Sequence, residues 1–138
     1  DQGATVEEQA APTKRVLWGD DDKTSLEIGT QILEHLGYEV IEANSGIEAV
    51  AQYRRAHDRI DVVVLDMVMP EMSGVETFEQ IKSNYPEARV LMASGYLLDA
   101  EARRLLEHGA DGFVKKPFVI DEIHQTIERV TRGDSHKK

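Results

Sequence analysis

Five short apolar runs alternate along the chain with segments that repeat apolar residues at helical spacing. The run Val62–Leu65 is apolar at every position, which is typical of a central parallel strand buried on both faces. Alternating strands and helices with short connections predict an α/β fold, a parallel sheet covered by helices on both sides. The expected strands are Arg15–Gly19, Glu39–Glu42, Asp61–Leu65, Arg89–Ala93 and Gly112–Lys115.

Each expected strand is followed by a segment with one apolar face, and several of these segments carry start or stop signals. Ser45 and Ser73 each precede a glutamate by three residues, which is the spacing of a helix capping box. Gly37 and Gly109 supply helix stops. The apolar stripes are Leu26, Leu33 and Leu36; Val50 and Tyr53; Phe78 and Ile81; Leu98, Ala102, Leu105 and Leu106; and Ile123, Ile127 and Val130.

The two ends of the sequence differ in composition from the segment between them. Residues 1–13 are small, polar and acidic, and residues 133–138 are polar, so we expect flexible tails around one domain at 14–132. The net charge of −10, from 16 basic and 26 acidic residues, argues against direct binding of nucleic acid. No run approaches the roughly 20 apolar residues of a membrane span, so we expect no membrane insertion by this segment. The lack of cysteine excludes disulfides and Cys-ligated metals.

Chemically active residue types stand where the expected strands end. In parallel α/β sheets, ligands bind outside the carboxyl ends of the strands. The first strand ends at Asp20 and Asp21, the third at Asp66, the fourth at Ser94 and the fifth at Lys116. Each residue alone is well explained as part of a turn or a helix cap. Their occurrence together at four strand ends favours a shared site.

The three carboxylates would repel one another at one edge of the sheet unless a cation lay between them. Mg²⁺ suits this set, because it takes oxygen ligands and keeps several of its waters. With Lys116 as a positive charge on its other side, Asp66 would be a nucleophile toward a phosphoryl group. The ion, Lys116 and the Ser94 hydroxyl could each stabilise one charged phosphoryl oxygen. We therefore expect an aspartyl phosphate at Asp66.

Four motifs resemble those of the response-regulator receiver domains of bacterial two-component systems. They are VLWGDDD at 16–22, VVVLDMVMPEMSG at 62–74, VLMASGY at 90–96 and GADGFVKKPF at 109–118. Their order and spacing agree, and the third-strand motif with its D-x-x-M-P is highly specific to this family. The resemblance implies a CheY-like, (βα)5 flavodoxin-like fold, which is a doubly wound parallel sheet with strand order 2-1-3-4-5.

The resemblance also implies residue roles. These are Asp66 as phosphoacceptor, Asp21 as direct Mg²⁺ ligand, Asp20 as a ligand largely through water, the backbone carbonyl of Val68 as a further ligand, Ser94 as switch hydroxyl, Lys116 as the active-site lysine and Phe113 as switch aromatic. Phosphorylation would draw Ser94 inward and turn Phe113. The surface made by the fourth helix, fifth strand and fifth helix would then change, as the populations of two states of the domain shift. The Lys116–Pro117 bond is a candidate for the cis form.

Partners and setting follow from the same resemblance. A histidine kinase would donate the phosphoryl group from a phosphohistidine, and a His phosphotransfer protein is the expected next acceptor. The chain could be a single-domain regulator or a receiver cut from a longer protein. The start at Asp1 favours a fragment, and the segments MASGY and GADGFVKKPF resemble C-terminal receivers of hybrid sensor histidine kinases, so a histidine kinase is the preferred parent. We expect a cytoplasmic location, free or tethered to a membrane sensor. We expect no enzymatic activity beyond the chain's own phosphorylation and dephosphorylation, and homodimers remain open.

Two pairs of residues depart from the usual family pattern. Trp18 and Gly19 replace an aliphatic pair at the end of the first strand, and we expect Trp18 in the core. Val68 and Tyr96 flank the phosphorylation site, where the family often has polar residues that influence the hydrolytic water. An apolar and a bulky residue there lead us to expect slow self-dephosphorylation.

Two other classes of protein stay open at this point. An aspartate-nucleophile phosphatase also uses a strand-end Asp with Mg²⁺, but it normally has a second Asp two residues later, where this chain has Val68. A receiver-like interaction module that is never phosphorylated usually has an eroded acidic pocket, whereas Asp20, Asp21 and Asp66 are all present here.

Overall fold

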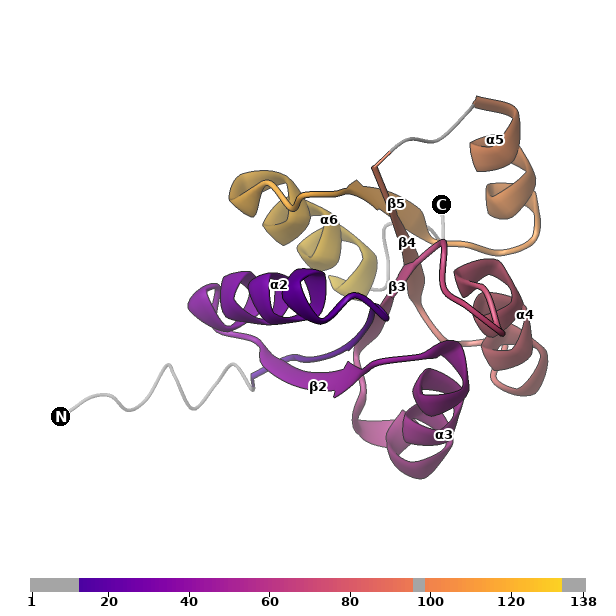
Figure 1. Cartoon of the computed structure of the whole chain (residues 1–138), viewed down its shortest axis with the longest axis horizontal. Helices are drawn as coiled ribbons and strands as arrows, with labels where there is room; N and C mark the ends of the chain where they lie inside the picture. The colour runs from indigo at the N-terminus through magenta and orange to yellow at the C-terminus, as the bar shows by residue number, and fades with distance from the viewer. Residues whose placement is uncertain (1–12, 96–98, 133–138) are drawn as a thin grey trace, which may run out of the picture.

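A five-stranded parallel sheet forms the centre of the computed structural model, which describes residues 13–95 and 99–132 (Figure 1). The strands are β1 Arg15–Gly19, β2 Glu39–Ala43, β3 Val62–Asp66, β4 Val90–Ser94 and β5 Gly112–Lys115. Their order is β2-β1-β3-β4-β5, and every neighbouring pair is parallel. This is the expected flavodoxin-like strand order.

Helices cover both faces of the sheet, as Figure 1 shows. The helices are α2 Lys23–His35, α3 Gly46–Ala56, α4 Gly74–Asn84, α5 Asp99–Glu107 and α6 Ile120–Arg132, with a short 3-10 turn, η1 His57–Arg59, after α3. One core cluster joins the sheet to α2 and α6, and a second joins it to α3, α4 and α5. Among the described residues, no helix is both long and apolar enough to cross a bilayer.

Trp18 lies in the core between the sheet and α2, as expected. Its side chain is almost fully buried, and the indole Nε1 donates a hydrogen bond of 3.1 Å to the backbone carbonyl of Leu26. A Cβ atom at Gly29 would lie 2.4 Å from that nitrogen, so the absence of a side chain at Gly29 makes room for the indole. The ring also packs 4.9 Å from that of Phe118.

The helix starts match the capping prediction at one site and depart from it at the other. Ser73 and Glu76 form the full reciprocal capping box at the start of α4. The Ser45 hydroxyl accepts from the Glu48 N–H, but the Glu48 carboxylate accepts from the Asn44 N–H instead. The same sequence spacing therefore gives a complete box only at α4.

The apolar stripe of α5 is narrower than expected. Leu105 is buried, whereas Leu106 is half exposed and is not a core residue. The expected stripe also included Leu98, which lies outside the described residues, as do the expected tails except Thr13.

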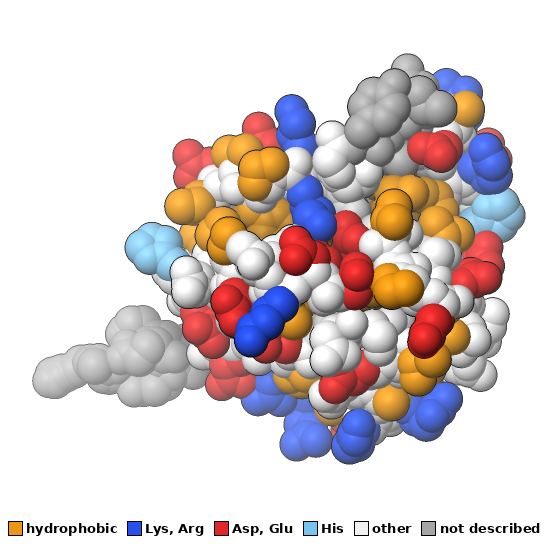
Figure 2. Space-filling model, viewed as in Figure 1, with side chains coloured by type: hydrophobic (Ala, Val, Ile, Leu, Met, Phe, Trp, Pro, Cys, Tyr) orange, Lys and Arg blue, Asp and Glu red, His pale blue; other side chains and the backbone are white. Residues whose placement is uncertain are grey.

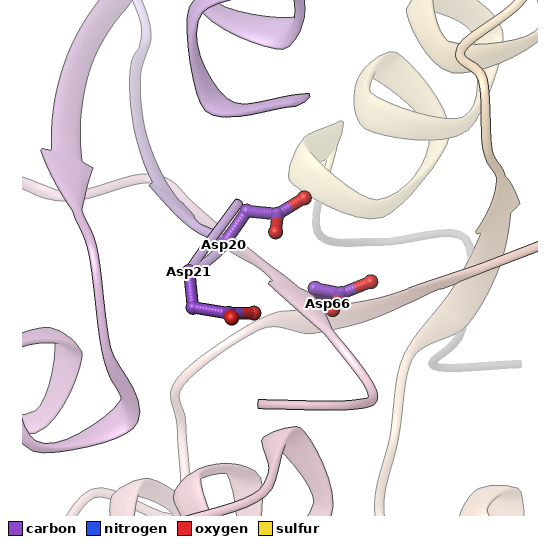
Figure 3. Close-up of side chains that lie close together, drawn as sticks. All are labelled: Asp20, Asp21 and Asp66. Carbon is purple, nitrogen blue, oxygen red and sulfur yellow. The ribbon is translucent and has the colours of Figure 1, made fainter. Parts of the chain in front are cut away.

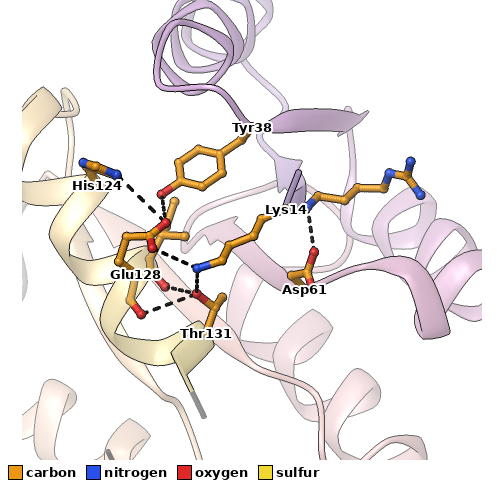
Figure 4. A network of polar contacts seen from close by, with 8 residues as sticks. Lys14, Tyr38, Asp61, His124, Glu128 and Thr131 are labelled. Atoms are coloured by element: carbon orange, nitrogen blue, oxygen red, sulfur yellow. Dashed lines mark hydrogen bonds and ion pairs between the residues drawn. The ribbon is translucent and has the colours of Figure 1, made fainter. Parts of the chain in front are cut away.

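A polar network fastens α6 to the beginnings of β1 and β2 (Figure 4). The Glu128 carboxylate accepts from the Lys14 ammonium at 2.9 Å and from the Tyr38 hydroxyl at 2.8 Å. Lys14 also donates to the Thr131 hydroxyl, and His124 Nε2 lies 3.9 Å from Glu128. Burial alone would raise the pKa of Glu128, but the hydrogen bonds from Lys14 and Tyr38 outweigh it, and the pKa is lowered. This network lies at the amino end of β1, away from the site described next.

Candidate functional site

The carboxyl ends of β1 and β3 bring three carboxylates together (Figure 3). Gly19 pairs with Leu65 in the sheet, so Asp20 and Asp66 come at the same level on neighbouring strands. One carboxylate oxygen from each of Asp20, Asp21 and Asp66 lies within 4.8 Å of the others. Asp20 and Asp66 are buried, and Asp21 is exposed. The grouping expected from the strand ends is therefore present.

Lys116, which follows β5 across the sheet, bridges two of these acids. Its ammonium donates hydrogen bonds of 2.8 Å to Asp20 Oδ2 and 2.8 Å to Asp66 Oδ1. Its exposed neighbour Lys115 carries no ion pair among the described residues. The Lys116–Pro117 bond is cis, as expected. The lysine thus compensates both buried carboxylates, a wider contact than the sequence indicated.

Asp20 is held by two further donors that the sequence did not reveal. The Ser25 hydroxyl donates to Asp20 Oδ2 at 2.5 Å, and the backbone N–H of Asp22 donates to Oδ1 at 3.0 Å. Asp22 occupies the N-cap position of α2, but its side chain makes no capping bond. Ser25 lies in the first turn of α2, and no motif or spacing singles it out.

The electrostatics of the site favour the arrival of a cation. Burial raises the pKa of Asp66, and the nearby Asp20 charge raises it further, although the hydrogen bond from Lys116 opposes both. Burial alone would lower the pKa of Lys116, but its bonds to Asp20 and Asp66 outweigh that and raise it. Lys116 therefore stays charged, while burial and the Asp20 charge destabilise the ionised form of Asp66.

The loop after β3 passes very close to Asp66. A Cβ atom at Gly74 would lie 2.0 Å from the Asp66 carbonyl oxygen, so only glycine fits there without movement. The Gly74 N–H donates to the Met67 carbonyl at 3.0 Å, and the Ser73 capping box anchors the following helix. Val68 is 81% exposed, and its backbone N–H lowers the Asp66 pKa through a hydrogen bond.

Ser94 and Phe113 lie on the two strands beyond β3. Ser94 ends β4, and its carbonyl accepts from the Lys116 N–H at 3.0 Å. Asp66 pairs with Ala93, so Ser94 lies one residue beyond the level of Asp66. Phe113 is half buried and packs against the core cluster under α3, α4 and α5. Tyr96, the other residue expected beside the site, lies outside the described residues.

The donor set suits a hard divalent ion. Three carboxylates supply oxygen ligands within one small space, which is the chemistry that Mg²⁺ prefers. Figure 2 shows acidic side chains in the middle of the face that it views, with basic ones beside them and further basic ones along its lower edge. Three of the 26 acidic residues of the chain are therefore grouped at this site.

Comparison with known proteins assigns this arrangement to a family. The model of the response regulator receiver domain matches residues 16–128. The chain belongs to the response-regulator receiver family. Receiver domains of two-component systems bind Mg²⁺ at such an acidic cluster and interact with histidine kinases. The family matches the resemblance seen in the four sequence motifs.

Curated relatives include both sensor kinases and response regulators. The sensor kinase CckA of Brucella abortus is 34% identical over 115 residues, which are 83% of this chain and 12% of that protein. The response regulator VraR of Staphylococcus aureus is 32% identical over 126 residues, which are 89% of this chain and 59% of that protein. The chain thus spans only part of each relative.

Solved receiver structures superpose closely on the chain. A receiver domain from Clostridium thermocellum has a TM-score of 0.83 at 27% identity, and the match covers 91% of this chain and 99% of that one. The CheX–CheY–BeF3–Mg²⁺ complex from Borrelia burgdorferi gives a TM-score of 0.82 at 31% identity, with 91% and 93% covered. Both confirm the CheY-like fold.

Proposed function

We propose that this receiver domain accepts a phosphoryl group on Asp66 from a phosphohistidine. The observation that carries the proposal is the pairing of Asp66 with Lys116 beside two further carboxylates. An Asp66 oxygen would attack the phosphorus as the P–N bond of the donor breaks. The imidazole nitrogen leaves with the electron pair of that bond and takes up a proton.

The residues around Asp66 have separate tasks in this step. Lys116 holds Asp66 Oδ1 and offers positive charge to the incoming phosphoryl oxygens. Asp20, Asp21, Asp66 and the Val68 carbonyl would hold Mg²⁺, with Asp21 as the direct ligand and Asp20 acting largely through water. When bound, the ion neutralises charge on the transferred group.

The same phosphoryl group would act as the switch. It adds charge and acceptor oxygens at Asp66, to which the Ser94 hydroxyl can bond. Phe113, now half buried against the core, would then take the space that the β4 loop leaves. The affected surface comprises α5, β5 and α6, the elements that follow Ser94. Such a switch changes the populations of two states.

We further propose a histidine kinase as the donor and a His phosphotransfer protein as a downstream acceptor. The likeness to the sensor kinase CckA supports a hybrid kinase as the parent, and the likeness to VraR supports a response regulator. The segments MASGY and GADGFVKKPF favour the hybrid kinase as the parent. A cytoplasmic location and homodimers belong to the same proposal.

The test is phosphorylation by a small phosphodonor. Wild type, Asp66→Asn and Asp21→Asn are each incubated with Mg²⁺ and acetyl phosphate, and the intact mass is measured. We expect wild type to gain one phosphoryl group, about 80 Da, because Asp66 is the acceptor. Asp66→Asn should gain nothing, and Asp21→Asn should react more slowly.

Each alternative gives a different result in this assay. Continuous turnover of phosphate esters without a lasting adduct would indicate a phosphatase. An unchanged wild-type mass at saturating donor and Mg²⁺ would indicate an interaction module that is never phosphorylated. Either result would overturn the proposed function.

A further inference from the structure

Ser25 has a contact in the acidic site that no motif assigns to it. Its hydroxyl donates to Asp20 Oδ2 at 2.5 Å, and the Lys116 ammonium donates to the same oxygen at 2.8 Å. The Asp22 N–H occupies the other Asp20 oxygen at 3.0 Å. The Asp20 carboxylate, only 1% exposed, is therefore fixed by three donors on its two oxygens.

The position of Lys116 depends on how well Asp20 is satisfied. The Lys116 ammonium donates one hydrogen bond to Asp20 Oδ2 and one to Asp66 Oδ1, each at 2.8 Å. A buried carboxylate needs donors, and losing one leaves a costly unsatisfied acceptor. The Ser25 hydroxyl supplies a neutral donor to Asp20, so Asp20 depends less on the hydrogen bond from Lys116.

We propose that Ser25 is a positioning residue, which orients Asp20 for a metal-bound water and keeps Lys116 directed at Asp66. The inference rests on the proposed phosphorylation of Asp66, but it also makes a prediction for Mg²⁺ binding alone. Without the hydroxyl, Asp20 can rotate and draw Lys116 toward itself. Both changes loosen the geometry of the site.

Ser25→Ala, Ser25→Thr and Thr24→Ala form a matched set for the test. Thr restores a hydroxyl at the same position, and Thr24 is an exposed hydroxyl residue next to Ser25 in the same helical turn. Mg²⁺ affinity is measured by calorimetry without a phosphodonor. The rate of adduct formation is then followed as Mg²⁺ and acetyl phosphate are varied, with thermal unfolding to check the fold.

We expect Ser25→Ala to weaken Mg²⁺ binding about tenfold, as is typical when a partner of a metal-site carboxylate is lost. Its adduct formation should need correspondingly more Mg²⁺ for half-maximal rate and stay slower at saturation. Ser25→Thr and Thr24→Ala should resemble wild type in both assays.

Three results would overturn the inference. They are unchanged Mg²⁺ affinity in Ser25→Ala, an Ser25→Thr variant as weak as Ser25→Ala, or an equal loss in Thr24→Ala. Wild type could bind Mg²⁺ about tenfold more tightly than Ser25→Ala and yet form no adduct. In that case the inference on Ser25 would stand, and the proposed function would fail.

Discussion

Removal of the Lys116 ammonium is the sharpest test of the electrostatic account. In Lys116→Met the side chain keeps its length but loses its charge, so the buried Asp20 and Asp66 face each other without compensation. Two unit charges 4.8 Å apart, the outer limit for these carboxylate oxygens, repel by about 3.5 kcal/mol at an effective dielectric constant of about 20. Proton uptake by Asp66 and the 23% exposure of Lys116 reduce that figure.

We therefore expect Lys116→Met to lower the free energy of unfolding by about 2–3 kcal/mol in metal-free buffer at neutral pH. For a domain of this size, the unfolding midpoint would fall by about 10 °C. Lys115→Met is the matched control, because that exposed neighbour carries no ion pair among the described residues, and it should be unchanged. Denaturant and thermal unfolding, followed by circular dichroism with a chelator present, measure both.

Two further measurements decide whether charge is the cause. Adding Asp66→Asn to Lys116→Met should recover most of the lost stability, because one of the two facing charges is gone. The loss should also shrink as pH falls toward the ordinary carboxyl value of 3.8, because Asp66, whose pKa is raised, takes up a proton and loses its charge. Lys116→Met as stable as wild type at neutral pH would refute the reasoning.

Three other changes have expected outcomes. Gly74→Ala should destabilise the fold by about 3 kcal/mol and slow adduct formation, because its Cβ would lie 2.0 Å from the Asp66 carbonyl oxygen. Gly95→Ala is the control and should be neutral in both assays, because its Cβ would lie 3.8 Å from the nearest atom, the Lys116 carbonyl oxygen. Glu128→Gln should cost roughly 1 kcal/mol at neutral pH, discounted for exposure, in denaturant unfolding. Because the folded-state pKa of Glu128 is lowered from 4.5, that difference should be present above pH 4.5 and vanish as pH falls through the lowered value. The exposed apolar Val68 should give the phosphorylated form a lifetime of minutes or more, measured by mass after donor removal, and a lifetime of seconds would contradict this.

The sequence predicted the fold well because the signals were redundant. Val62–Leu65 is buried at every position, as its unbroken apolar run indicated. The expected third and fourth strands each began one residue early and stopped before Asp66 and Ser94. The apolar runs locate these strands but do not mark their ends to the residue, because strand ends are set by pairing with neighbouring strands: Asp66 pairs with Ala93, and Ser94 pairs with Lys115. Helical spacing likewise does not fix how wide the buried face of a helix is, and Leu106 fits the expected stripe of α5 but is half exposed.

The candidate site was predictable as a set of residues but not as a network. Strand ends meet at one edge of a parallel sheet, so the grouping of Asp20 and Asp66 with Lys116 follows from topology. Hydrogen-bond partners depend on side-chain directions that no linear pattern encodes. The donation from Ser25 to Asp20 and the network around Glu128 were both missed for this reason.

The location of the phosphoryl group tests the central claim most directly. The adduct formed with Mg²⁺ and acetyl phosphate is trapped with borohydride, which reduces an acyl phosphate to an alcohol, and the modified residue is found by peptide mass mapping. The account predicts one modified residue, Asp66, and none when Mg²⁺ is chelated. Modification at Asp20, at Asp21 or at a histidine, or labelling of Asp66 that survives chelation, would contradict it.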